Sequence, residues 1–266
     1  MSKNRCAIVT VAFGPVVERL DYTFLSFAKN PQCDLHAFII GHRLPSAQFA
    51  PIQYHLVAPT ADFSHALREV YFRRYELIEA VEAEYAVIVD CHDVLCLQPL
   101  PDLSHLVGPA ALGACVELSG GRYILGQGYT SSYLNAGVTY WNVAKSREMR
   151  ARIVERGRSR FRNLVDDQIC LNEVVQTCYY DQLRILPCQY NFRANCQVRQ
   201  RGVPMVDHLD GVVVYHNSAS MELAKNLAGT KPKADLPNLP RDAAPIRPLR
   251  QFWRRVKQRI TPHVVK

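Results

Sequence analysis

Short runs of apolar residues alternate along the chain with longer stretches in which apolar residues recur at helical spacing. The strand-length runs, several of them rich in β-branched residues, are 6–12, 35–40, 54–57 and 86–89. The helical patterns are 16–28 and 64–83. A run that is apolar at every position is typical of a strand covered on both faces of a parallel sheet. The alternation therefore predicts an α/β fold with a parallel sheet and a nucleotide-type crevice at the carboxyl ends of its strands.

The same pattern continues in the second half of the chain. Further strands are expected at 110–118, within 132–143 and at 212–215, with short extended segments at 183–187 and 190–192. Helices are expected over 144–162 and 165–176. The glycine-rich segment 120–128 lacks the spacing of a phosphate-binding motif, so we expect a loop there.

The pattern changes at residue 227. Five prolines between 232 and 248 break any regular element, which predicts a linker over 227–248. Beyond it, 249–266 has Leu249, Phe252, Trp253, Val256 and Ile260 at helical spacing, with basic residues between them. A basic amphipathic helix of this kind is typical of membrane-surface binding. The alternatives are a packed C-terminal helix with a solvated basic face and a nucleic-acid-binding patch.

Charge and cysteine content limit the function classes. The formal net charge is +8, and the segment 244–266 contains seven basic residues and no acidic one, so the rest of the chain has a net charge of only +1. A nucleic-acid-binding protein would need basic residues across the body, so this class is disfavoured. The nine cysteines form no C-x-x-C pair, which favours reduced thiols in a cytosolic protein over a disulfide framework.

Two carboxylates follow the apolar run 86–89. The run stops at Asp90, and Asp93 comes three residues later. Carboxylates at the end of a buried strand are costly unless something pairs with them, and their oxygens suit a hard cation such as Mg²⁺ or Mn²⁺. Such a cation can hold a diphosphate and neutralise its charge as a leaving group. Alternatively, Asp90 is a loop residue and Asp93 a turn former.

Five segments, in order, resemble family 8, the retaining nucleotide-sugar glycosyltransferases that include glycogenin and bacterial lipopolysaccharide galactosyl- and glucosyltransferases. They are VIVDCHDVLCLQPL at 87–100, YLNAGVTYWN at 133–142, DDQICLN at 166–172, LPCQYNF at 186–192 and VVVYHN at 212–217. The resemblance implies a single GT-A type nucleotide-diphospho-sugar transferase domain over 1–226. It also implies that this domain is a Rossmann-like mixed sheet flanked by helices.

The resemblance implies a metal site made by Asp90, Asp93 and His216, which would hold Mn²⁺, or Mg²⁺, on the diphosphate of a UDP-sugar. The family's usual spacing is D-x-D, whereas this chain has D-x-x-D. A turn or bulge must therefore bring Asp93 round. Alternatively, His92 takes the place of one carboxylate.

A second implied group binds the donor sugar. Asn135 matches an asparagine that contacts the sugar, and Ala136 and Gly137 let the backbone come close to it. Asp167 would hydrogen-bond sugar hydroxyls, and Gln168 would lie near the anomeric carbon. On residue type alone, the Asn-Ala-Gly segment is equally a turn, and Asp167 is equally a helix-capping residue.

The remaining implied contacts are to the nucleotide. The family has a basic residue near the diphosphate on the helix before the metal strand, and here Arg73 and Arg74 occupy that region. Neighbours on a helix point about 100° apart, so only one can face the site, and we favour Arg73 for catalysis and keep Arg74 as a cofactor-binding residue. Thr10 and Ala12 match the segment that holds the uridine.

The implied function is transfer of a hexose from a UDP-sugar to an acceptor hydroxyl, with retention of configuration, in cell-surface polysaccharide (lipopolysaccharide or capsule) synthesis. The acceptor would be a glycan or a lipid-linked glycan, because the segment 249–266 can bind an anionic membrane surface. We expect a cytoplasmic protein that is peripheral on the membrane.

Two other functions are compatible with the sequence. A degenerate glycosyltransferase-like binding domain is one, because the family's Lys-Pro-Trp after the histidine is replaced by Asn-Ser-Ala at 217–219, with Lys225 as a loose substitute. The completeness of the implied metal and sugar set argues against it. A sugar-nucleotide hydrolase or nucleotidyltransferase is the other, and it would need a glycine-rich phosphate loop after the first strand, which AFGPVVER lacks.

Overall fold

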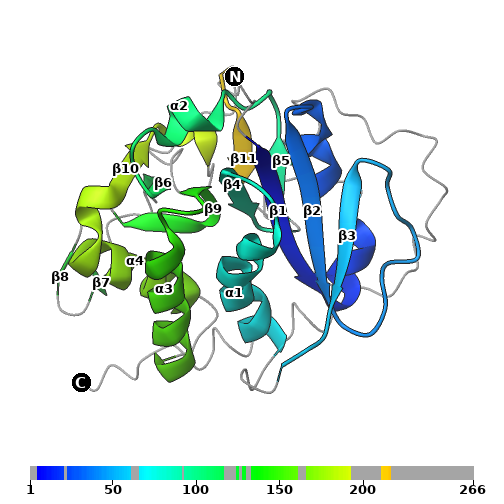
Figure 1. The fold of residues 1–266 in the computed structure, drawn as a ribbon, viewed down its shortest axis with the longest axis horizontal. Coiled ribbons are helices and arrows are strands. Elements are labelled where there is room, and N and C mark those ends of the chain that lie inside the picture. The colour runs from blue at the N-terminus through cyan, green and yellow to red at the C-terminus, as the bar shows by residue number, and fades with distance from the viewer. Residues whose placement is uncertain are drawn as a thin grey trace, which may run out of the picture. The chain divides into compact units, whose positions relative to one another are not determined.

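A computed structural model gives the fold of the protein (Figure 1). The structure describes residues 5–20, 23–60, 66–91, 93–116, 124–125, 128–129, 133–160, 166–192 and 211–216. All of them belong to a compact unit, Met1–Ala228, and the second unit, Gly229–Lys266, lies outside the described residues. The predicted linker 227–248 and tail helix 249–266 are therefore untested. His92, Lys225 and 217–219 also lie outside.

A seven-stranded mixed sheet forms the centre of the fold, with strand order β10-β6-β9-β4-β1-β2-β3. The strands are β1 (Cys6–Phe13), β2 (Cys33–Ile40), β3 (Ile52–Val57), β4 (Tyr85–Val89), β6 (Leu112–Val116), β9 (Leu134–Asn142) and β10 (Leu183–Leu186). Within this sheet β9 runs antiparallel to β4 and β6, and the other neighbours are parallel. Every residue of β4 is buried, as its unbroken apolar run predicts.

Two small ribbons complete the described strands. β5 (Val94–Cys96) pairs antiparallel with β11 (Val214–His216), and β7 (Ile124–Leu125) pairs antiparallel with β8 (Gly128–Tyr129). The β5–β11 ribbon positions the site, because it joins the segment that follows β4 to residues 214–216, which are far away in the sequence.

Helices cover both faces of the sheet (Figure 1). Residues of α1 (Ala66–Leu77), α3 (Arg147–Arg160) and α4 (Asp166–Cys178) share one core cluster with the sheet. The opposite cluster includes residues of α2 (Leu103–Val107) and of two 3₁₀ helices, Gly14–Arg19 and Phe24–Lys29. The remaining 3₁₀ helices are Ile78–Ala80, Tyr180–Gln182 and Cys188–Tyr190.

The single helix predicted over 16–28 is wrong. Two 3₁₀ helices of six residues each occupy this region, and side chains on both sides of the second helix bond to the backbone. The hydroxyl of Thr23 donates to the Cys91 carbonyl oxygen at 2.6 Å, and Asn30 binds both the Phe27 carbonyl oxygen and the Leu100 backbone N–H. Such side-chain bonds to backbone offer an alternative to a continuous helix.

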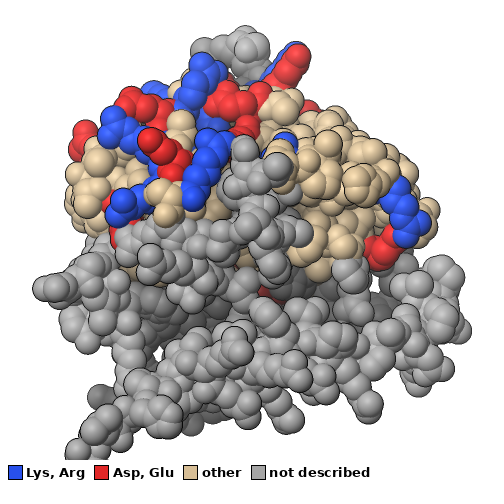
Figure 2. Space-filling view, turned by 90° about the horizontal axis from the view of Figure 1, so that it is seen from below, with Lys and Arg blue, Asp and Glu red and all other residues tan. Residues whose placement is uncertain are grey.

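Figure 2 shows positive and negative side chains interspersed on the described part of one face of the molecule. Ion pairs join α3 to its neighbours: Arg156 pairs with Glu173 of α4, and Arg158 pairs with Glu76 of α1. None of the helices that the structure describes is long and apolar enough to cross a bilayer.

Candidate active site

The end of β4 and the β5–β11 ribbon bring three candidate ligands together. Asp90 directly follows β4, and Asp93 directly precedes β5. Because β11 pairs with β5 so that His216 is opposite Val94, the histidine is next to the turn that holds both carboxylates. His216 Nε2 is 3.6 Å from Asp90 Oδ2 and 3.6 Å from Asp93 Oδ2. One ligand atom from each residue lies within 4.8 Å of the others.

This group suits a hard divalent cation. Two carboxylates and one imidazole are the mixed oxygen and nitrogen donors that Mn²⁺ accepts, and Mg²⁺ also binds carboxylates. Asp93 Oδ1 is buried and has no hydrogen-bond partner among the described residues. A buried carboxylate oxygen without a partner is costly, and a cation would satisfy it. The D-x-x-D spacing is accommodated by the turn between β4 and β5.

The backbone of β9 lies directly against the ligands at Gly137. The Asp90 backbone N–H donates to the Gly137 carbonyl oxygen at 2.8 Å. A Cβ atom built on Gly137 would lie 2.2 Å from His216 Cε1 and 2.5 Å from Asp90 Oδ2, so no larger residue fits without displacing them. The resemblance assigns Gly137 to sugar binding, and the structure shows a steric requirement at the ligands as well.

A network of side-chain amides lies next to the ligands. Gln168 Oε1 accepts from the Ala136 backbone N–H at 3.0 Å and from Asn135 Nδ2 at 3.1 Å. Asn135 Oδ1 accepts from the Gly137 backbone N–H at 3.0 Å and from Asn191 Nδ2 at 2.8 Å. The network thus joins the start of α4 to β9 and brings the predicted sugar-binding residues beside the predicted metal ligands.

Arg74 links the two halves of the site. Its side chain is 4% exposed; Nη1 donates to Asp90 Oδ1 at 2.7 Å, and Nη2 donates to Asp167 Oδ2. Burial alone would lower the pKa of Arg74, but Tyr75, Asp167 and Asp90 outweigh it and raise the pKa above its usual value. The guanidinium is therefore a permanent positive charge between two carboxylates.

The Arg73 guanidinium makes a hydrogen bond to a backbone carbonyl oxygen, not to one of these carboxylates. Its Nη1 donates to the Ala58 carbonyl oxygen at 2.8 Å. Arg74 contacts Asp90 and Asp167, whereas Arg73 Nη1 contacts a backbone carbonyl oxygen. The catalytic role expected of Arg73 stays a prediction, and these contacts favour Arg74 for it. Neighbours on a helix point about 100° apart, so the two arginines face different surroundings.

The two residues expected to contact the uridine lie on β1. Thr10 and Ala12 are both buried, and the Thr10 hydroxyl donates to the Val89 carbonyl oxygen at 2.9 Å. The Thr10 side chain thus fixes β1 to the last residue of β4, directly before Asp90.

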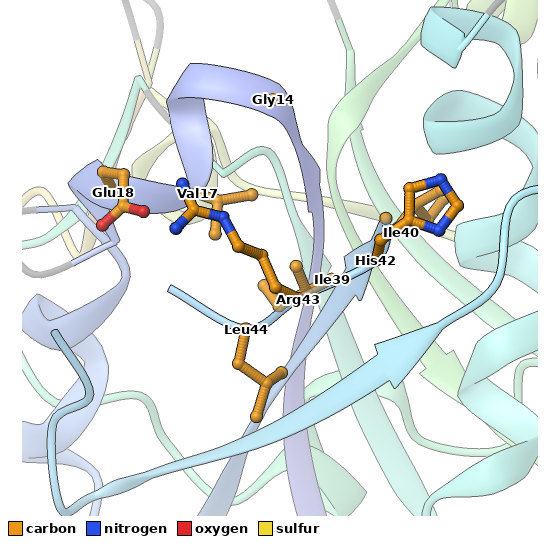
Figure 3. A pocket seen from close by; sticks show the side chains of 9 residues that line it. Gly14, Val17, Glu18, Ile39, Ile40, His42, Arg43 and Leu44 are labelled. Atoms are coloured by element: carbon orange, nitrogen blue, oxygen red, sulfur yellow. The ribbon is translucent and has the colours of Figure 1, made fainter. Parts of the chain in front are cut away.

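A pocket of about 480 Å³ lies where β1 and β2 end (Figure 3). It is lined by Gly14, Val17, Glu18, Ile39, Ile40, Gly41, His42, Arg43 and Leu44. None of these residues is in the predicted site, and the Glu18 carboxylate accepts from the Ser46 hydroxyl at 2.6 Å.

Asn191 is the site residue that sequence reasoning missed. It is 1% exposed, and its amide joins Asn135 to His216 Nδ1, which is 2.9 Å from Asn191 Oδ1. It belongs to the segment LPCQYNF, which contributed to the resemblance without an assigned role.

Comparison with solved structures identifies the fold. The chain is similar to the galactosyltransferase LgtC, solved in complex with donor and acceptor sugar analogues, with a TM-score of 0.59 and 20% identity over 87% of this chain and 98% of that one. It is also similar to the glycosyltransferase GlyE of Streptococcus pneumoniae TIGR4, with a TM-score of 0.50 and 18% identity over 80% of this chain and 54% of that one. No protein-family model and no curated protein sequence matches. The protein thus has the GT-A glycosyltransferase fold, as predicted.

Proposed function

We propose that the protein is a metal-dependent glycosyltransferase that moves a hexose from a UDP-sugar to a hydroxyl of a sugar acceptor. The observation that supports this most strongly is the Asp90–Asp93–His216 group with its unpartnered carboxylate oxygen, at the carboxyl end of a central strand. Ligands of open α/β sheets bind at this edge. The fold shared with LgtC, a galactosyltransferase solved with donor and acceptor analogues, agrees with it.

In this proposal Asp90, Asp93 and His216 hold Mn²⁺ or Mg²⁺. The cation would supply positive charge for the diphosphate of the donor as it leaves. Arg74 orients Asp90 through its 2.7 Å contact and holds Asp167 through a second hydrogen bond. Positive groups fixed in advance, where negative charge develops, stabilise the transition state without reorganisation.

Asn135 and Gln168 would bind the donor sugar together with Asp167. Their amides already bond to each other and to the β9 backbone, so their orientation is fixed before a ligand arrives. Gln168 has an amide where a double-displacement enzyme would need a carboxylate nucleophile. We therefore propose that retention, as the family resemblance implies, proceeds by attack of the acceptor on the face that the diphosphate leaves.

The cell-surface acceptor and the membrane association belong to the same proposal. Seven basic residues and no acidic one within 244–266 would favour an anionic leaflet, where each adds about 1 kcal/mol of binding. A lipid-linked glycan at that surface would then be within reach of the catalytic domain.

Turnover of donor sugars tests the proposed reaction. The full chain, incubated with a panel of UDP-hexoses, should release UDP from at least one of them in the presence of Mn²⁺ and not after chelation by EDTA. Asp93→Asn should reduce that release at least 100-fold, because it removes a charged metal ligand. The matched control is Asp102→Asn, at the exposed cap of α2, which should keep wild-type turnover. Equal UDP release with EDTA, or from Asp93→Asn, would contradict the proposal.

A further inference from the structure

Asn191 lies beside the Nδ1 atom of His216, and backbone hydrogen bonds of its neighbour hold it there. It follows the 3₁₀ helix Cys188–Tyr190, and the next residue, Phe192, bonds on both sides to the strand that ends in the histidine. The Phe192 N–H donates to the Val214 carbonyl oxygen at 2.8 Å, and the His216 N–H donates to the Phe192 carbonyl oxygen at 2.9 Å. The two side chains are thus held by one backbone ladder.

Backbone N–H groups fix the orientation of the amides. A backbone N–H can only donate, so the Asn135 atom that contacts the Gly137 N–H must be the amide oxygen. The Asn191 atom 2.8 Å from that oxygen must then be its NH₂ group. The same nitrogen is 3.5 Å from the Val138 carbonyl oxygen, which is also only an acceptor. The other amide atom of Asn191, next to His216, is therefore its oxygen.

The orientation of Asn191 determines the tautomer of His216. An amide oxygen can only accept, so His216 Nδ1, at 2.9 Å, must have the hydrogen. In the neutral ring, Nε2 is then a bare lone pair, and this atom is the one 3.6 Å from both carboxylates. The opposite tautomer would place a hydrogen between the imidazole and the carboxylates.

We infer that Asn191 is a positioning residue that holds His216 in its Nδ1–H tautomer, so that Nε2 presents a lone pair toward a divalent cation. The effect on metal binding rests on the proposed metal site. The tautomer of His216 follows from the amide network alone. Removing a group that hydrogen-bonds to the other ring nitrogen of a histidine ligand typically lowers metal affinity by about 10–100-fold. Gly137 has two roles. The absence of a side chain leaves space for His216 and Asp90, and its N–H fixes which atom of the Asn135 amide is the oxygen.

Three variants of the full chain test the inference. Asn191→Leu has nearly the same size but makes no hydrogen bond, and Asn191→Asp keeps an acceptor for Nδ1. Asn30→Leu is the matched control, because Asn30 is also 1% exposed and also bonds to backbone, but in the 3₁₀ region. Stability is measured for each, so that only folded protein is compared.

Mn²⁺ affinity, followed by the electron paramagnetic resonance of free Mn²⁺, should fall about 10–100-fold in Asn191→Leu. It should fall less in Asn191→Asp, which keeps the acceptor for Nδ1 but loses the NH₂ group that faces Asn135 Oδ1. It should be unchanged in Asn30→Leu, although that variant loses stability. Equal Mn²⁺ affinity of wild type and Asn191→Leu would overturn the claim that Asn191 supports metal binding through His216. If wild type itself binds no Mn²⁺, the proposed function fails instead.

The second readout needs no metal. Nitrogen-15 NMR of the His216 ring in metal-free protein should show the hydrogen on Nδ1 in wild type, with the other tautomer gaining population in Asn191→Leu. A wild-type ring with a hydrogen on Nε2, alone or together with one on Nδ1, would overturn the inference, whether or not any variant folds. The two readouts thus separate failure of the tautomer argument from failure of the metal site.

Discussion

Replacing Arg74 by methionine is expected to lower the free energy of unfolding by about 3–5 kcal/mol, measured by urea denaturation. The reason is that Arg74 is the partner of two carboxylates, and the Asp167 side chain is only 7% exposed. Removing one partner of a buried ion pair leaves an uncompensated charge in a medium that solvates it poorly. Donor turnover should be lost as well, because Asp90 and Asp167 both lose their orientation.

The neighbouring arginine gives the control for this experiment. Arg73→Met, at the residue whose guanidinium bonds to the Ala58 carbonyl oxygen, should change stability by no more than about 1 kcal/mol. The double variant Arg74→Met/Asp167→Asn should be more stable than Arg74→Met, because the second change removes the stranded charge. Similar losses for Arg73→Met and Arg74→Met would contradict the account of this ion-pair group.

Gly137→Ala is expected to abolish metal-dependent donor turnover and to lower stability by about 1–3 kcal/mol. The added Cβ would lie 2.2 Å from His216 Cε1, 2.5 Å from Asp90 Oδ2 and 2.9 Å from His216 Nε2. His216 is the last residue of β11 and Asp90 directly follows β4, so relieving the overlap must move at least one of these ligands. Turnover of UDP-sugars and Mn²⁺ affinity, measured on the folded variant, test this directly.

Gly113, on β6 of the same sheet, provides the comparison. A Cβ there would meet the Leu186 Cδ1 atom at 3.1 Å, the far end of a flexible side chain that can move. Gly113→Ala should therefore keep the metal-dependent turnover, whatever stability it loses. If Gly137→Ala and Gly113→Ala retained the same activity, close packing of β9 against the ligands would have no functional importance.

The sheet was predictable because its strands have strong local signals. β1, β2 and β4 are apolar at nearly every position, and each occurs close to its expected place. The mixed direction of the sheet followed from the family resemblance, because β9 is buried at every residue, as a parallel strand is, and its sequence does not reveal that it runs antiparallel.

The structure places Asp90, Asp93 and His216 together as the resemblance implied, but some parts of the site have no local signal. Asn191 acts through contacts with β9 and β11 that join segments far apart in sequence. The choice between Arg73 and Arg74 depends on the rotation of α1 against the sheet, and the apolar spacing over 64–83 predicts the helix without deciding which of two adjacent arginines faces the site. Likewise, β5 is only three residues long and exists because β11 pairs with it.

The central claim is that Asp90, Asp93 and His216 form one metal site that binds a nucleoside diphosphate. The most direct measurement is thermal stability with Mn²⁺ alone, UDP alone and both together. A ligand that binds only the folded state, at 100 times its dissociation constant, adds about 2.7 kcal/mol. We expect full stabilisation only when both are present, and its loss in Asp93→Ala and His216→Ala. Stabilisation by UDP without metal, or unchanged stabilisation in both variants, would contradict the claim.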